Sequence, residues 1–424
     1  MSSPLKVMIV GAGTGGLCLA QGLKSDGIPV EVFEREHTPT DRRAGYRLSI
    51  SPTGNRAFQE CLPESLFQKL VNSSARPSRG VSILDERLKP LLTVDFPEAD
   101  PESVDCERPI SRITLRQLLV QGLDEVVHFN KKFVGFDDAP HGRVTARFDD
   151  GTTATGDLLV GADGANSYVR GQLLPHAQRA ETGIMAVSGK LGLNAKVREL
   201  TPPAVFRGPT LMLGPKGCFL FANAVEYERT DASIPRGQSN ICDLLSDDRE
   251  EYVMWGFSAR REKFGSCANG AALHPETFKT AVLTLMKDWD PALRWTVQNS
   301  TDISTFLVKT AVPIPAWETR NVTLLGDALH NMTPYRGMGA NVALRDAAAL
   351  RRALVRVAHG ESLLRESLAA YERQMIEYGF RAVRTSVANM RQVHSEGIER
   401  ELTKLIFRLM NRLPRLKEKV YSKR

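Results

Sequence analysis

Apolar and polar residues form distinct blocks at the start of the chain. Two short apolar runs, residues 7–10 and 30–33, flank a glycine-rich segment and a helical run over residues 17–23. Short continuous apolar runs are typical of strands that are buried on both faces of a sheet. The order strand, helix, strand within about 30 residues therefore predicts a βαβ unit of a parallel sheet.

The segment between these elements has the glycine spacing of a dinucleotide-binding turn. Gly11 permits a tight turn, Gly13 permits close approach of a pyrophosphate, and Gly16 permits close packing of the helix on the sheet. Glu34 follows the second strand, near the separation of about 20 residues at which a carboxylate binds ribose hydroxyls. A glycine motif alone is weak, but both strands, the helix and the acidic end are present, so a nucleotide site is predicted here.

A further apolar run, residues 158–161, leads into a turn that contains Asp163 and Gly164. A helical run begins after Ser167 and ends at Arg170. This pattern predicts a buried parallel strand followed by a strand-to-helix turn, a position at which α/β sheets bind ligands.

A third turn of this kind follows residues 322–325 and contains Gly326 and Asp327. Gly337 and Gly339 then precede a long alanine-rich helix. Backbone N–H groups at the start of a helix carry partial positive charge, so this loop is expected to face a negatively charged ligand group.

Two polar residues near these turns are interpreted as structural from the pattern alone. Arg112 lies in the first turn of an amphipathic helix that begins at residue 111, where a solvated arginine is the simpler interpretation. His330 is one polar residue in a loop, where a hydrogen-bonded structural histidine is favoured over a catalytic base.

Between about residues 180 and 295, strand-like runs recur without βαβ alternation. This favours an antiparallel sheet that can wall a cavity. The earlier runs 81–84 and 91–94 predict a hairpin in a sheet other than that of the nucleotide unit. Large side chains of the region could line a pocket, although most are expected in the core: Phe206, Met212, Phe219, Phe221, Met254, Trp255 and Phe257.

The chain ends in two predicted helices, residues 361–390 and 398–410. The second helix has apolar residues at helical spacing and is followed by basic residues. Contact with an acidic membrane surface is one interpretation. A helix packed on its own protein, with a solvated basic end, is favoured.

Composition adds few constraints. The 424 residues are 42% hydrophobic and 25% charged, which is ordinary for a globular protein with two or three domains. The net charge of +7 does not by itself indicate nucleic acid, because much of the basic excess lies in the C-terminal tail. Neither a signal peptide nor a membrane span is expected, and six scattered cysteines favour a reduced, cytoplasmic protein without a metal site.

The three turns occur in the order and at the separations found in single-component FAD-dependent aromatic hydroxylases. The chain resembles this family of para-hydroxybenzoate hydroxylase, salicylate hydroxylase and the tetracycline-inactivating monooxygenases over nearly its whole length, to about residue 390. The resemblance implies an α/β fold with a Rossmann-like FAD-binding domain of the para-hydroxybenzoate hydroxylase type. The expected divisions are an FAD-binding domain of residues 1–75, 98–178 and 300–358, an antiparallel-sheet substrate domain of residues 76–97 and 179–299, and a C-terminal helical region of residues 359–424.

The resemblance also implies which residues contact FAD. The fingerprint glycines would hold the pyrophosphate, Glu34 the adenosine ribose and Asp327 the ribityl chain, while residues 334–341 would cover the pyrimidine edge of the flavin. The full implied set is Gly11, Gly13, Thr14, Gly15, Gly16, Glu34, Arg35, Arg43, Arg112, Val134, Asp163, Gly164, Asp327, Pro334, Gly337, Met338, Gly339, Ala340 and Asn341. No catalytic residue is assigned, and the candidates near flavin and substrate are Arg47, Tyr46, Pro334 and Arg336.

The activity that the resemblance implies is monooxygenation. NADPH or NADH reduces FAD, O₂ adds at flavin C4a, and the resulting hydroperoxide hydroxylates or epoxidises an aromatic, polycyclic or isoprenoid compound. No second glycine fingerprint follows a strand and no Trp-x-Trp pair occurs, which argues against two-dinucleotide reductases and against flavin halogenases.

Two alternatives remain open, an FAD-dependent reductase or dehydrogenase of the same fold and a non-catalytic carrier. The expected partners are a hydrophobic small molecule and O₂, in a monomer or homodimer that binds neither nucleic acid nor, in the favoured interpretation, a membrane. An acidic substrate would need a cationic anchor, for which Arg47 and Arg207 are candidates.

Overall fold

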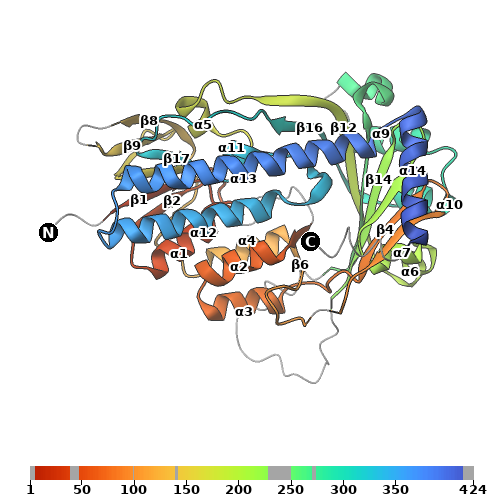
Figure 1. Cartoon of the computed structure of the whole chain (residues 1–424), viewed down its shortest axis with the longest axis horizontal. Helices are drawn as coiled ribbons and strands as arrows, with labels where there is room; N and C mark the ends of the chain where they lie inside the picture. The colour runs from red at the N-terminus through yellow and green to blue at the C-terminus, as the bar shows by residue number, and fades with distance from the viewer. Residues whose placement is uncertain are drawn as a thin grey trace. The chain divides into compact units, whose positions relative to one another are not determined.

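The computed structural model describes residues 5–38, 47–98, 100–138, 142–227, 250–269 and 274–413. The chain divides into two compact units (Figure 1). Unit 1 contains Met1–Ser74, Glu102–Ala180 and Lys309–Val387, and unit 2 contains Ala75–Pro101, Glu181–Val308 and Ala388–Arg424. Two candidate site residues, Arg43 and Tyr46, lie outside the described residues.

Unit 1 is built on a five-stranded sheet in the order β17-β11-β1-β2-β7, and the described strand pairs are parallel. All residues of β1 and β11 are buried, which accounts for their continuous apolar sequences. The βαβ prediction is confirmed. The strands are β1 (Val7–Val10), β2 (Val30–Phe33), β7 (Val127–His128), β11 (Leu158–Gly161) and β17 (Val322–Leu324).

Helices α1 (Thr14–Ser25), α2 (Pro52–Cys61) and α12 (Gly339–Ala358) pack on one another in unit 1 (Figure 1). Gly22 of α1 permits this packing, since an added Cβ would lie 2.5 Å from the side chain of Arg351 in α12. The Arg351 guanidinium in turn pairs with Asp26, with both N···O distances at 2.7 Å. A bidentate pair of this kind fixes the orientation of the two helices.

The remaining elements of unit 1 are short. Strands β3 (Arg47–Ile50) and β6 (Arg108–Ser111) form an antiparallel pair, and β8 (Phe133–Asp138), β9 (Val144–Phe148) and β10 (Thr153–Gly156) form a separate small sheet. The helices are α3 (Glu64–Asn72), α4 (Arg112–Val120), α5 (Tyr168–Leu173), α11 (Asp327–His330) and the 3₁₀ turn η3 (Pro334–Arg336).

Unit 2 contains a seven-stranded sheet in the order β16-β12-β15-β14-β13-β4-β5. Its strands are β4 (Gly80–Asp85), β5 (Pro90–Asp95), β12 (Arg179–Gly192), β13 (Thr210–Leu213), β14 (Phe219–Val225), β15 (Tyr252–Arg260) and β16 (Thr301–Ala311). The predicted β4–β5 hairpin is confirmed and lies outside the parallel sheet.

The expectation of a purely antiparallel sheet is wrong at one pair. Strands β13 and β4 run parallel, with Thr210 opposite Ser82. The hairpin enters this sheet from more than 100 residues earlier in the chain, so no tight turn joins the two strands and their direction is not constrained to be antiparallel.

One face of the unit 2 sheet packs on helices to form a core. Met212, Trp255 and Phe257, offered above as pocket candidates, are each at most 1% exposed and belong to this core. Gly214 permits the packing of Trp289, since an added Cβ would lie 2.0 Å from its ring. The helices of this unit are α6 (Ala195–Leu200), α7 (Pro203–Arg207), η2 (Arg261–Asn269), α9 (Pro275–Leu285) and α10 (Pro291–Gln298).

Both predicted C-terminal helices are present, as α13 (Leu364–Val393) and α14 (Gly397–Arg412). Most of α13 belongs to unit 1, and α14 belongs to unit 2. A separate C-terminal helical region of residues 359–424, expected from the sequence, stays a prediction. Among the described residues, every helix is too short or too polar to cross a bilayer.

Candidate cofactor site

The glycine-rich turn after β1 contains glycines that closely packed neighbours require and one that borders open space. Gly11 has φ +108°, and a Cβ there would lie 2.5 Å from the Ala162 carbonyl oxygen. A Cβ on Gly16 would lie 2.2 Å from the Gly11 carbonyl oxygen. Gly13 differs, because its Cβ would meet no atom within 4 Å. Packing within the chain therefore explains Gly11 and Gly16, whereas Gly13 borders open space, as a phosphate cradle requires.

Helix α1 begins at this turn with Thr14, and Gly15 packs against Leu325 of the third turn. The first turn of α1 contains no acidic residue. By contrast, the Ser111 hydroxyl caps the start of α4 by accepting hydrogen bonds from backbone N–H groups. Uncapped N–H groups and the helix dipole make the start of α1 suited to an anion.

Glu34 lies beside this turn at the end of β2 and is 7% exposed. Its Oε2 accepts a hydrogen bond from Ala12 N at 2.7 Å, and its Oε1 accepts one from Glu36 N at 3.1 Å. The carboxylate is thus held against the glycine turn by backbone donors. Its contact with a ribose stays a prediction.

Arg116 is a residue of this region that the sequence interpretation missed. It lies one turn after Arg112 on α4 and is 7% exposed. Its Nε donates to the Ala12 carbonyl at 3.2 Å, and its guanidinium pairs with Glu36 and lies 3.6 Å from Glu34. Arg112 itself is exposed at the first position of α4. The sequence of α4 carries no signal that separates buried Arg116 from exposed Arg112, and only the contact with Ala12 does so.

Asp163 and Gly164 follow β11, directly beside β1. Asp163 Oδ2 accepts hydrogen bonds from Tyr168 N at 2.7 Å and Val169 N at 3.3 Å. Its Oδ1 is buried and has no hydrogen-bond partner among the described residues. Burial raises the pKa of this carboxyl, with hydrogen bonds from its neighbours opposing the shift. A buried oxygen of this kind fits a hydroxyl or N–H group of a ligand.

Asp327 begins α11 after Gly326 and is half-buried. Gly339, at the start of α12, lies beside it, since an added Cβ would be 3.8 Å from Asp327 Oδ1. Met338 precedes α12 without a side-chain cap, and the first turn of α12 contains no acidic residue. A carboxylate and the positive end of a 20-residue helix thus lie together.

The remaining residues predicted to contact FAD or substrate differ in burial. Asn341 uses its amide within the chain, with Nδ2 donating to Ser49 O at 2.9 Å and Oδ1 accepting from Ser51 N at 2.8 Å. Arg35 is exposed, and Val134 on β8 is 49% exposed. The half-buried residues are Thr14, Arg47, Arg336, Met338 and Ala340, whereas Pro334 and Gly337 are exposed. The cofactor roles of all these residues stay predictions.

A buried network supports the Gly326–Asp327 turn. Asp346 in α12 is 0% exposed and accepts hydrogen bonds from Gly326 N at 2.8 Å and Tyr378 Oη at 2.6 Å. Its Oδ2 also lies 2.7 Å from His330 Nε2. Burial lowers the pKa of His330, but the charge and hydrogen bond of Asp346 outweigh it, and the net pKa is raised. His330 is buried and hydrogen-bonded, as the sequence interpretation expected, and a structural role for it stays a prediction; its partner Asp346 was not anticipated.

A second buried carboxyl, Glu372 in α13, yields a pH prediction. It accepts hydrogen bonds from Thr319 Oγ1 at 2.6 Å and Thr323 Oγ1 at 2.8 Å. Burial raises its pKa from 4.5 to about 7. The pKa of Glu372 is higher in the folded protein than in the unfolded chain. The protonated carboxyl therefore makes its full contribution to the unfolding free energy below about pH 4.5, and this contribution is lost as pH rises through about 7.

Replacing Glu372 by Gln is expected to remove this pH dependence. The unfolding free energy of wild type should fall relative to that of Glu372→Gln as pH rises. Between pH 4.5 and pH 8, the difference between the two proteins should change by up to about 3 kcal/mol in favour of the variant. Urea unfolding at several pH values measures this difference. Glu377→Gln, at a carboxylate whose side chain is 71% exposed on the same helix, is the control. Parallel pH profiles of wild type and Glu372→Gln would contradict the prediction.

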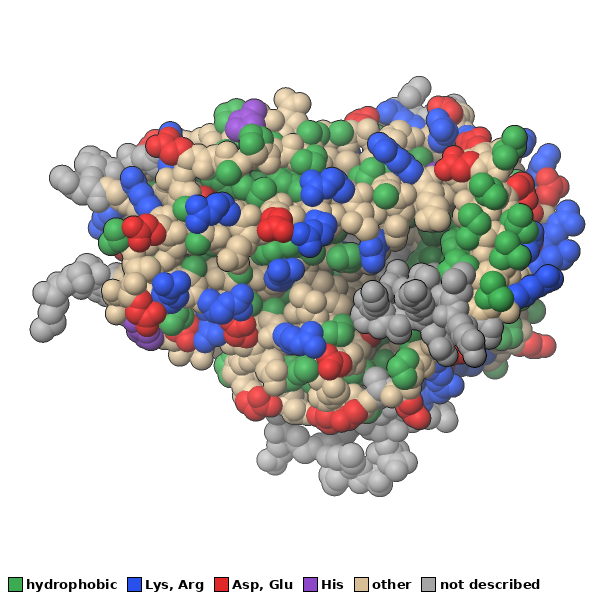
Figure 2. Space-filling view, viewed as in Figure 1, with side chains coloured by type: hydrophobic (Ala, Val, Ile, Leu, Met, Phe, Trp, Pro, Cys, Tyr) green, Lys and Arg blue, Asp and Glu red, His purple; other side chains and the backbone are tan. Residues whose placement is uncertain are grey.

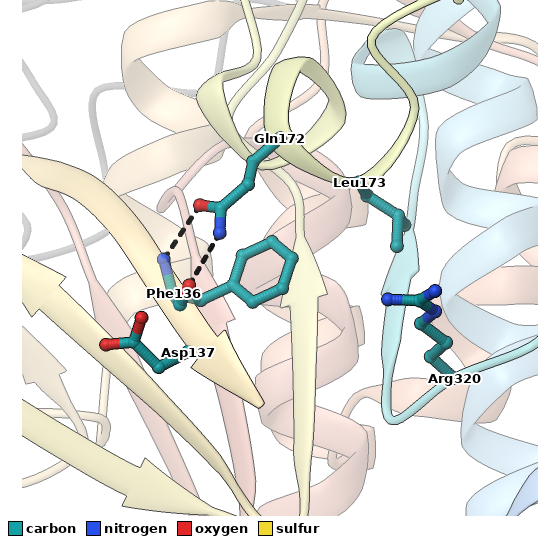
Figure 3. Close-up of a pocket in the computed structure, with 5 residues that line it drawn as sticks. All are labelled: Phe136, Asp137, Gln172, Leu173 and Arg320. Atoms are coloured by element: carbon teal, nitrogen blue, oxygen red, sulfur yellow. Dashed lines mark hydrogen bonds between the residues drawn. The ribbon is translucent and has the colours of Figure 1, made fainter. Parts of the chain in front are cut away.

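Unit 1 also has a polar surface pocket of about 330 Å³ between β8 and α5 (Figure 3). Gln172 closes one side by pairing with the backbone of Phe136, accepting from its N at 2.9 Å and donating to its O at 2.6 Å. Asp137, Leu173 and Arg320 complete the lining. None of the predicted cofactor residues lines this pocket, so it is separate from the glycine turns.

The residues around the glycine turns fit FAD. Open space at Gly13 and an uncapped helix start suit a pyrophosphate, and the unpartnered Asp163 oxygen suits a ligand donor. Asp327 beside the start of α12 adds a second polar region on the same parallel sheet. These features define a protein of the dinucleotide-binding α/β class.

Comparison with known proteins identifies the family. The FAD binding domain model matches residues 115–386, and the NAD(P)-binding Rossmann-like domain model matches residues 9–64. The chain therefore belongs to the FAD-binding domain family that includes FAD-dependent monooxygenases.

Three similar proteins illustrate this membership. The dual O-methyltransferase/FAD-dependent monooxygenase elcB of Phaeosphaeria nodorum is 31% identical over 387 residues, which cover 82% of this chain and 40% of that protein. The FAD-dependent monooxygenase dbaB of Emericella nidulans is 30% identical over 369 residues, covering 84% and 88%. The crystal structure of an FAD-containing monooxygenase from Photorhabdus luminescens gives a TM-score of 0.80 at 30% identity, covering 92% and 98%. The chain spans about two fifths of the length of the first curated relatives that it matches.

Proposed function

We propose that this chain is an FAD-dependent monooxygenase. It would use NADPH or NADH and O₂ to place one oxygen atom in an aromatic, polycyclic or isoprenoid small molecule, with the second oxygen atom leaving as water. The observation that supports this most is the grouping of three turns on one parallel sheet, each with a feature suited to FAD, in a chain of this family.

The chain's own residues would bind and orient the cofactor. The N–H groups at the start of α1 and the space beside Gly13 would hold the pyrophosphate, and Glu34 would bind the ribose. Asp163 and Asp327 would accept hydrogen bonds from the cofactor's hydroxyl groups. The start of α12 would stabilise negative charge at the flavin. When bound, FAD supplies the electron transfer and the activation of O₂.

A hydrophobic substrate is supported by the second face of the unit 2 sheet. Leu211 pairs with Phe221 across β13 and β14, and Asn223 pairs with Met254 across β14 and β15. Since alternate residues share a face, Leu211, Phe221 and Met254 lie together on the face opposite the Trp255 core, and all three are half-buried.

Asn223 adds a polar group to this face. It is 1% exposed, and its Oδ1 is buried with no hydrogen-bond partner among the described residues. It would accept a hydrogen bond from a phenolic hydroxyl or ring N–H group of the substrate. Arg207, one of the two candidate anchors for an acidic substrate, already pairs with Asp95 and is therefore less available to a substrate carboxylate.

The proposal predicts that the purified protein binds FAD and oxidises NADPH or NADH faster when a suitable substrate is present. The assay compares phenols, indoles, polycyclic aromatics and isoprenoid quinones, counting NAD(P)H, hydrogen peroxide and oxygenated product separately. One compound is expected to increase NAD(P)H oxidation and yield product with little peroxide. NAD(P)H-dependent reduction of the organic substrate without oxygenation would indicate the reductase alternative, and a protein without flavin would indicate the carrier.

A further inference from the structure

Helix α14 in unit 2 exposes its hydrophobic face. Ile398 is 89% exposed, and five further aliphatic side chains of the same stripe are about half exposed: Leu402 53%, Leu405 49%, Ile406 47%, Leu409 50% and Leu413 54%. Figure 2 shows a row of hydrophobic side chains along this helix, with lysine and arginine side chains at its outer edge. We call these six residues the α14 stripe.

The opposite face of α14 is charged, and it packs on the protein. Arg400 is 2% exposed and donates to the carbonyls of Val393 and Cys218, at 2.8 and 3.3 Å. Lys404 is 6% exposed and lies 3.2 Å from a Glu86 carboxylate oxygen.

Two residues near the end of the helix continue this contact with the hairpin. Arg408 lies 3.9 Å from Asp85, and the Asn411 side chain accepts a hydrogen bond from Thr93 N. Helix α14 thus packs on its own protein, as expected from the sequence, but it does so through its polar face. These ion pairs and hydrogen bonds orient the helix with its apolar side outward.

The stripe is continuous because its residues are spaced by three or four positions, apart from the adjacent pair Leu405 and Ile406. A 16-residue helix is about 24 Å long, so the stripe is long but only one helix wide. Amphipathic helices of globular proteins normally bury this face, and contiguous exposed apolar patches mark interaction sites.

Charge indicates which kind of partner covers the stripe. Arg412 lies at the C-terminal end of the helix, whereas Arg408 lies on the packed face near Asp85. The sequence directly after Leu413 contains five basic residues and one acidic residue: Arg415, Lys417, Lys419, Lys423, Arg424 and Glu418. An apolar helical stripe that continues into a basic segment is the pattern of helices that lie in the interface of an anionic bilayer.

We propose that α14 docks this protein on the surface of an anionic lipid bilayer. The stripe would lie at the level of the acyl-chain boundary, and the basic residues would contact the lipid phosphates. A second copy of the chain fits less well. A stripe one helix wide is narrow for the roughly 1,000 Å² of buried surface that stable protein interfaces need, and such a pairing would leave the basic segment unused. The inference does not depend on the proposed catalytic activity.

Vesicle co-sedimentation of the full-length protein tests this proposal. Wild type is expected to bind vesicles of phosphatidylcholine with phosphatidylglycerol at least about tenfold more tightly than vesicles of phosphatidylcholine alone. The double substitution Leu402→Asp and Leu409→Asp should lower binding to the anionic vesicles by at least about tenfold, because it places two charges in the apolar face. Both positions are about half exposed, so the fold should tolerate the changes.

The control is Leu363→Asp, at a leucine that is 68% exposed in unit 1, outside α14. It adds negative charge at another exposed leucine and should leave vesicle binding unchanged. Unfolding midpoints of all variants check that they are folded. Failure of wild type to bind either vesicle, or equal binding by wild type and the double variant, would overturn the proposal. So would light scattering that shows a dimer lost in the double variant without vesicle binding by wild type, because the stripe would then be a dimer interface.

Discussion

Gly13→Ala is expected to fold as stably as wild type without cofactor and to bind FAD about 100-fold more weakly. An added Cβ at Gly13 meets no atom of the chain within 4 Å, so the apoprotein should accommodate it. The same methyl group would occupy the space through which a pyrophosphate approaches the backbone at the start of α1. Titration of the apoprotein with FAD gives the affinity, and urea unfolding of the apoprotein gives its stability.

Two glycine substitutions serve as controls. Gly171→Ala lies in α5, where the added Cβ also meets no atom within 4 Å, and it should leave FAD affinity unchanged. Gly16→Ala brings a Cβ to 2.2 Å from the Gly11 carbonyl oxygen, so it should destabilise even the apoprotein. Unchanged FAD affinity in Gly13→Ala would show that the pyrophosphate does not bind at this turn.

Asp346→Ala is expected to lower the unfolding free energy by about 3–5 kcal/mol. The carboxylate is completely buried, and its loss leaves Gly326 N–H, the His330 imidazole and the Tyr378 hydroxyl without their shared acceptor. Asp346 is a positioning residue for the Gly326–Asp327 turn, so FAD affinity should fall as well. Urea unfolding and FAD titration measure the two effects.

Tyr378→Phe is expected to destabilise the protein less than Asp346→Ala does. It removes one hydrogen bond to Asp346 but keeps the ring on which Arg345 stacks at 3.8 Å, so a loss of about 1 kcal/mol is expected. A loss below about 1 kcal/mol in Asp346→Ala would show that the network does not stabilise the fold. Reduced stability with unchanged FAD affinity would show that the network does not position the turn.

Much of unit 1 could be predicted from the sequence because its signals are local. The residues of β1, Gly11 to Gly16 and the end of β2 lie within one βαβ unit, and each part constrains the next. The same holds for Asp163 after β11 and Asp327 after β17, since the two residues lie two and three positions after the end of their strands. The parallel pairing of β13 with β4 could not be predicted, because it joins segments that are far apart in the chain.

The orientation and burial of polar side chains also could not be predicted from the sequence. Arg116 and Asp346 lie on helices whose sequences do not distinguish a solvated charge from a buried one, and only the three-dimensional contacts with Ala12 and Gly326 do so. For helix α14, the sequence did not show which way its apolar face points. Its periodicity locates the apolar stripe correctly, but the direction of that stripe is set by the ion pairs of Lys404 and Arg408 with the β4–β5 turn region.

Turnover under isotopically labelled O₂ tests the proposed monooxygenase activity most directly. The measurement uses purified protein with FAD, NADPH or NADH, and the compound that most increases NAD(P)H oxidation, followed by mass spectrometry of the product. Monooxygenation predicts one labelled oxygen atom in each product molecule and one NAD(P)H consumed for each product formed. Product without the label, or label found only in peroxide and water, would contradict the proposed function.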